Sequence, residues 1–132
     1  MRKAEIRAVF QISLNLKRSS IQEIISILKQ LFSKGAIVDS QDNHNFTPLM
    51  YAIETNHIEI VDFLLNNHAN VNVKLFNGSV ALHMAARLGH FDILKVMLDF
   101  GPNLDCQDNG GLTPLMFAII NGHLETAKLL IR

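Results

Sequence analysis

The chain has 132 residues with no formal net charge, since 12 basic residues balance 12 acidic ones, and 48% of its residues are hydrophobic. This length and composition allow one packed domain and exclude a disordered tail, and no apolar run approaches the roughly 20 residues that span a bilayer. The single cysteine, Cys106, cannot form an internal disulfide, so we expect a cytoplasmic or nuclear protein in a reducing compartment.

The N-terminal segment, residues 1–41, predicts two helices. Apolar residues recur at spacings of three and four between Lys3 and Leu16, which predicts an amphipathic helix. Ser20 and Glu23 then form a capping box that begins a second helix, and Gly35 stops it. We interpret this segment as a diverged terminal repeat that covers the open end of an array.

Charge is unevenly distributed along the chain. Residues 1–38 carry seven basic and two acidic residues, a balance of +5, whereas residues 39–132 carry five basic and ten acidic residues, a balance of −5. The ordinary interpretation of the basic segment is a solvated helix face. The alternative is a site for an acidic protein, a phosphoinositide or a nucleic acid, and the spacing does not decide between them.

From residue 42 onward the sequence repeats every 33 residues, which is the interval from His57 to His90. Three residue types recur at this interval: His57, His90 and His123; Leu49, Leu82 and Leu115; and Ala52, Ala85 and Ala118. Each unit carries two short apolar stripes at helical spacing, with a tight turn between them and a loop rich in Asn, Asp and Gly after them. The period therefore predicts a turn, a helix, a tight turn, a second helix and a loop in every unit.

The units differ at the ends of their helices. Thr47 is expected to cap a helix whose first residue is Pro48, whereas Val80 stands at the equivalent position of the next unit and provides no hydroxyl. Asn56 and His68 replace glycine at two positions that require a left-handed backbone. We expect His68 to cost on the order of 1 kcal/mol there.

The pattern Thr-Pro-Leu at residues 47–49 and 113–115, with Gly-His at residues 89–90 and 122–123, resembles the ankyrin repeat from Asp42 to Arg132. The resemblance implies an all-α solenoid of stacked helix pairs with projecting β-turn fingers. It implies one domain, 1–132, made of a capping repeat (1–41), two full repeats (42–74 and 75–107) and a partial repeat (108–132). The last repeat stops inside its second helix, so we expect Leu129, Leu130 and Ile131 to expose an apolar edge and the chain to be the first part of a longer protein.

The sequence offers no signal for chemistry. It contains no CxxC, HExxH, GxSxG or Walker motif, and nothing near Cys106 indicates an activated thiol. The three periodic histidines belong to successive repeats about 10 Å apart, too far to share one zinc ion. We therefore predict no catalytic residue, no metal and no cofactor, and a protein that is not an enzyme.

What the resemblance implies instead is a binding surface in the concave groove, made by the fingers and the exposed side of the first helices. The expected partner-binding residues are Asn43, His44, Phe46, Glu54, Thr55, Phe76, Asn77, Ser79, Arg87, Leu88, Asn109, Leu112, Ile120 and Asn121. Five of them are large and apolar, and with Arg87 they have the composition of an interface hot spot. The alternative is that some, Phe46 above all, fold back onto their own finger.

The most direct interpretation is a monomeric, non-catalytic module that binds a partner protein in this groove, with no nucleic acid expected. An alternative is that the chain is the targeting or adaptor part of a longer protein whose catalytic or effector domain lies elsewhere. A weaker third interpretation has the basic residues 1–38 contacting an acidic ligand.

Overall fold

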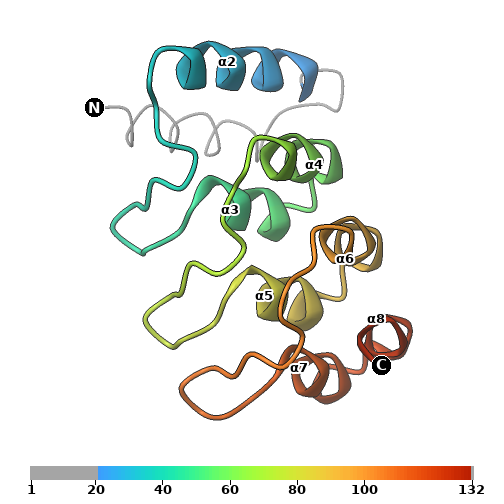
Figure 1. Ribbon diagram of the computed structural model, residues 1–132. Coiled ribbons are helices and arrows are strands. Elements are labelled where there is room, and N and C mark those ends of the chain that lie inside the picture. Colours follow the sequence, from blue (N-terminus) through green and yellow to red (C-terminus); the bar gives the residue numbers. More distant parts are fainter. Residues whose placement is uncertain (1–20, 132) are drawn as a thin grey trace. The chain divides into compact units, whose positions relative to one another are not determined.

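The computed structural model describes residues 21–131, and every regular element within that range is a helix (Figure 1). The predicted all-α fold class is therefore confirmed for this range. The chain divides into two compact units, which meet in sequence between Ala69 and Asn70. The helix expected from Lys3 to Leu16, the capping residue Ser20 and most of the basic N-terminal residues lie outside the described residues.

In the described part of the first unit, three helices pack around one apolar layer. They are α2 (Ile21–Ser33), α3 (Pro48–Glu54) and α4 (Ile58–Asn66), with α4 in contact with both of the others. Leu28 of α2 and Ile60 of α4 are completely buried. Beside them the rings of Phe32 and Phe63 stack with their centroids 6.2 Å apart. Leu28 and Phe32 thus lie on the face of α2 that packs on α4.

The second unit consists of two helix pairs. They are α5 (Ala81–Leu88) with α6 (Phe91–Leu98), and α7 (Pro114–Ile120) with α8 (Leu124–Leu130). Helix α7 packs on α5 and α8 packs on α6, so equivalent helices of successive repeats are neighbours. The loops that precede α5 and α7 project to the same side of this unit (Figure 1). Ile93, Leu94 and Met97 of α6 are completely buried between these helices.

The helix starts follow the predicted capping chemistry. Thr47 and Thr113 each accept a hydrogen bond at the hydroxyl from a backbone N–H three residues later, at 3.3 Å, and proline follows each of them. Val80 offers no such hydroxyl to α5, as predicted. Instead the backbone N–H of Val80 donates to Nδ1 of His83 at 3.1 Å, so a side chain from inside the helix binds the residue that precedes it.

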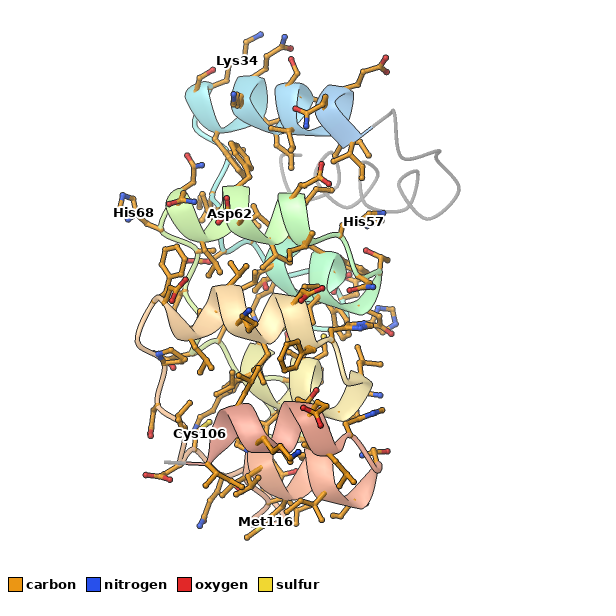
Figure 2. All side chains as sticks on the ribbon, turned by 90° about the vertical axis from the view of Figure 1, so that its right-hand side faces the viewer. Lys34, His57, Asp62, His68, Cys106 and Met116 are labelled. Carbon is orange, nitrogen blue, oxygen red and sulfur yellow. The ribbon has the colours of Figure 1, made fainter. Side chains whose placement is uncertain are left out.

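Asn56 and His68 adopt left-handed backbone conformations, as predicted. Their φ angles are 59° and 68°, and Asn45 adds a third non-glycine residue at 62°. His68 follows α4 at the position that glycine occupies after α2 and α6, and its side chain is exposed (Figure 2). Its imidazole therefore gains little burial in return for the strained backbone.

Replacing His68 with glycine is expected to stabilise the chain by about 1 kcal/mol, because glycine adopts a positive φ without the Cβ clash. Urea unfolding followed by circular dichroism would measure the change. Gly101→Ala is the matched control, since Gly101 lies one period later with a φ of 66° and open space around it. The control should lose a similar amount of stability, and no gain from His68→Gly would contradict the assignment of strain.

Candidate functional site

The loops that precede α5 and α7 form two tight fingers, residues 75–79 and 108–112. Each finger closes with a backbone hydrogen bond, from Leu75 N–H to the Ser79 carbonyl at 2.8 Å and from Asp108 N–H to the Leu112 carbonyl at 2.9 Å. The Asp108 carboxylate also accepts the N–H groups of Gly110 and Leu112, both at 2.9 Å. These bonds satisfy the polar backbone inside each turn and give the fingers defined shapes.

The two fingers of the second unit are bonded to each other. The backbone N–H of Asn109 donates to the Asn77 carbonyl at 2.9 Å, and its side-chain amide donates to the Phe76 carbonyl at 3.0 Å. Gly78 makes this approach possible, because a Cβ at that position would lie 2.5 Å from the Asn109 side chain. The pairing fixes the backbone of Phe76 while 78% of that residue remains exposed.

The finger of the first unit, residues 42–46, is anchored differently. Asp42 Oδ1 accepts the N–H groups of His44 and Phe46, at 2.8 and 3.0 Å. Asp42 Oδ2 accepts the phenolic hydrogen of Tyr51, which belongs to α3. The Phe46 ring packs on the Tyr51 ring with centroids 5.0 Å apart, so Phe46 is half-buried on its own repeat rather than fully presented to solvent.

The predicted partner-binding residues fall into three groups by exposure. The exposed group consists of Asn43, His44, Glu54, Phe76, Asn77, Arg87, Asn109, Ile120 and Asn121. Phe46, Thr55, Leu88 and Leu112 are half-buried, and Ser79 is buried. Among the five large apolar side chains, Phe76 and Ile120 are therefore the two that stand free. The expectation that Ser79 lies on the surface was wrong, because the residue sits at the base of its finger immediately before α5.

Hydrogen bonds connect several of these residues within each unit. In the second unit, Phe76, Asn77 and Asn109 meet at the paired fingers. The Arg87 carbonyl accepts a hydrogen bond from Nε2 of His123 at 2.9 Å. In the first unit, Thr55 Oγ1 lies 2.6 Å from Nδ1 of His57. Two of the periodic histidines thus bind neighbouring protein groups at the turns between helices.

The burial of His83 and the exposure of Met116, Ile119 and Leu124 were not identified from the sequence. His83 is buried, with 1% exposed. Its Nδ1 accepts a hydrogen bond from the backbone N–H of Val80, and its Nε2 lies 2.9 Å from the Leu112 carbonyl oxygen. Helices α7 and α8 and the residue after them expose several large apolar side chains, and Met116 lies at the edge of the unit in Figure 2. These side chains are Met116, Ile119, Ile120, Leu124 and Ile131, of which Ile120 and Ile131 were expected to be exposed. Leu130, which we expected at this edge, is buried at 5% exposure.

The repeat period contained a signal for the burial of His83 and for these exposed side chains, but not for the hydrogen bonds of His83. His83 and Ala86 are buried on α5, the helix on which α7 packs, and Met116 and Ile119 occupy the equivalent positions of α7.

Within the described residues, 21–131, there is no group of three His, Cys, Asp or Glu residues that could hold a metal ion. Nor is any helix of that range long and apolar enough to cross a membrane.

Cys106 lies half-buried in the loop between α6 and α7 (Figure 2). Burial raises the pKa of its thiol, because desolvation penalises the thiolate, and the nearby Asp105 carboxylate acts in the same direction. The backbone hydrogen bond and the Lys74 ammonium oppose the shift but are weaker than the desolvation. A raised pKa leaves the sulfur as the unreactive thiol at neutral pH.

Burial lowers the pKa of His57, which lies in the turn between α3 and α4, and the carboxylate of Glu59 opposes the shift (Figure 2). The folded state therefore binds this proton less tightly than the unfolded chain, so stability should fall as pH drops through the ordinary histidine range near 6.5. Urea unfolding at pH 7.5 and 5.5 would measure the loss. His57→Gln should lose less stability over this interval than the wild type, and equal losses would contradict the assignment.

Two family models and several known proteins are similar to this chain, and they agree on one kind of repeat. Two family models, both described as ankyrin repeats in many copies, match residues 32–85 and 82–131. The ankyrin repeat protein FPV223 of fowlpox virus is 33% identical over 79% of this chain and 72% of its own length. Another fowlpox virus protein, the ankyrin repeat protein FPV031, is 35% identical over 82% of this chain and 33% of its own length.

The relatives also include a multi-domain protein. The E3 ubiquitin-protein ligase XBAT33 of Arabidopsis thaliana is 38% identical over 64% of this chain, and the match spans 17% of the ligase. The chain thus corresponds to only part of the length of several of its relatives.

Proposed function

Since the chain belongs to the ankyrin-repeat family, whose repeats generally mediate protein–protein interaction, we propose that it is a non-catalytic module that binds a partner protein through its fingers and first helices. The single observation that carries the proposal is the paired fingers of the second unit. Asn109 holds the tip of the preceding finger by one hydrogen bond to the Phe76 carbonyl and one to the Asn77 carbonyl, while 78% of Phe76 remains exposed. A large aromatic side chain on a fixed backbone is a typical interface anchor.

The remaining exposed residues of this unit support the same surface. Arg87 and Ile120 are exposed at equivalent positions of α5 and α7, the helices that follow the two fingers. Ile120 has 66% of its surface exposed, which is unusual for isoleucine in a packed helical protein. Aromatic, arginine and aliphatic side chains on one rigid unit need little ordering when a partner binds.

A second candidate function is recruitment within a longer protein. The observation that favours it is the match to a ubiquitin ligase, of which this chain corresponds to 17%. In that case the chain would select the partner, and a domain elsewhere in the polypeptide would act on it. For either function we place the protein in a reducing compartment of the cell, on the basis of its one half-buried free cysteine, and we expect it to act as a monomer.

A pull-down from a lysate of the source cells, read by mass spectrometry, tests the proposal. The variant Phe76→Ala, Arg87→Ala, Ile120→Ala removes three exposed side chains of the proposed surface. The matched control is Asp92→Ala, Glu125→Ala, Lys128→Ala, which removes three exposed side chains of the second helices, including an exposed ion pair that contributes little to stability.

Both variants should retain the wild-type circular dichroism spectrum. A protein captured by the wild type and the control but lost by the surface variant would support the proposal. Capture that persists in the surface variant and disappears in the control would place binding on the second helices and contradict it.

A further inference from the structure

The finger of the first unit, residues 42–46, carries a combination of groups that the other fingers lack. Asp42 is followed nine residues later by Tyr51, and the residues one period after Tyr51 are Met84 and then Phe117, neither of which has a hydroxyl. The residue one period after Asp42 is Leu75, which has no carboxylate. The pairing of a carboxylate with a phenol therefore occurs at one finger of the repeat pattern.

The geometry links α3 to the tip of this finger through one carboxylate. Asp42 Oδ2 accepts the Tyr51 hydroxyl, while Oδ1 accepts the N–H groups of His44 at 2.8 Å and Phe46 at 3.0 Å. The Tyr51 ring also packs on the Phe46 ring, at 5.0 Å between centroids. Tyr51 thus holds both the acceptor that shapes the turn and the aromatic residue that ends it.

The finger needs this support because part of its backbone is strained. Asn45 has a φ of 62°, a left-handed conformation that a non-glycine residue adopts at a cost. Its carbonyl accepts a hydrogen bond from the Gln41 side chain at 3.1 Å. Gly78 and Gly111 occupy the corresponding place in the other two fingers, where no such cost arises. A side-chain anchor on Asp42 offsets a strain that the other fingers avoid.

We propose that Tyr51 is a positioning residue for partner recognition: through Asp42 and Phe46 it fixes the finger that presents the exposed side chains of Asn43 and His44. The inference rests on the proposed function, because it assigns these two residues to the partner-binding surface. Tyr51 itself is half-buried and acts through the finger rather than through contact with the partner. In the second unit the pairing of Asn109 with the neighbouring finger performs the equivalent task.

Amide hydrogen exchange measured by NMR tests the positioning without any partner. Tyr51→Phe removes the hydroxyl and keeps the ring on Phe46, so the His44 and Phe46 amides should exchange about tenfold faster, as expected for the loss of a hydrogen bond to a charged group. The amides of Gly110 and Leu112, which bond to Asp108 in the same way, are the internal control and should not change. In an Asp42→Asn background the same substitution should have a much smaller effect.

Unchanged exchange at His44 and Phe46 would overturn the positioning role. So would an equal acceleration at those amides and at the buried Ile60 and Leu64 of α4, since that result means global destabilisation. Partner capture by Tyr51→Phe in the pull-down then distinguishes the positioning role of Tyr51 from the proposed partner-binding function. Weaker capture by Tyr51→Phe, together with local acceleration, supports both. Local acceleration with undiminished capture would remove this finger from the binding surface and overturn the inference, while binding through the second unit would stand or fall on the pull-down described above.

Discussion

Replacing Gly89 with alanine should destabilise the chain by about 2–3 kcal/mol, as measured by urea unfolding. Gly89 ends α5 in the left-handed conformation, with a φ of 71°, which costs a residue with a Cβ roughly 1–2 kcal/mol. The new Cβ would also lie 2.5 Å from the His123 ring. Because Nε2 of that ring binds the Arg87 carbonyl, moving the ring aside sacrifices a hydrogen bond between the two helix pairs, worth about 1 kcal/mol.

Gly122→Ala is the control for this substitution. Gly122 lies one period later in the equivalent turn, has a φ of 76°, and has no atom within 4 Å of its Cβ position. It should therefore show the backbone cost alone, roughly 1–2 kcal/mol. Equal losses for the two variants would mean that contact with His123 contributes nothing to the packing of α7 and α8 on α5 and α6.

Replacing His83 with leucine should cost about 3 kcal/mol although leucine is apolar and fits a buried position. The backbone N–H of Val80 can only donate, so Nδ1 accepts and Nε2 carries the hydrogen that binds the Leu112 carbonyl. Leucine leaves both backbone groups without these partners, at about 1–3 kcal/mol for each that stays buried. It also removes the edge-on contact with the Phe117 ring, at 5.6 Å between centroids. Urea unfolding would again measure the loss.

Met50→Leu separates this effect from simple repacking. Met50 lies one period before His83, on α3, and is buried to the same extent, with 1% exposed. A volume-conserving apolar exchange there should cost less than about 1.5 kcal/mol. If His83→Leu costs no more than Met50→Leu, the two hydrogen bonds of His83 do not stabilise α5 or the finger that contains Leu112.

Much of the fold followed from residues whose role is local. The repeat period located the helix pairs, and the threonine and proline at residues 47–48 and 113–114 located two helix starts. The positive φ angles of Asn56 and His68 followed from the glycines at equivalent positions. These features depend on backbone sterics and on hydrogen bonds within a few residues, so a single sequence contains them.

Features that depend on particular side-chain contacts were missed or left open. The period shows that Met50, His83 and Met116 occupy equivalent positions, but not that His83 binds the carbonyl of Leu112 in the next repeat. The period also placed Phe46 and Phe76 on fingers and left open whether Phe46 folds back; it did not specify that Phe46 packs on Tyr51 while Phe76 stays exposed. Whether a finger residue is available to a partner is decided by such contacts, which the repeat pattern does not specify.

The measurement that most directly tests binding at the fingers is hydrogen–deuterium exchange of the chain with and without its captured partner, read by mass spectrometry. Protection should appear in peptides that cover residues 75–79 and 108–112 and in the last turns of α5 and α7. The second helices α6 and α8 should exchange at the same rate in both states. Protection confined to α6 and α8, or to residues 1–38, would contradict a partner-binding surface built on the fingers and first helices.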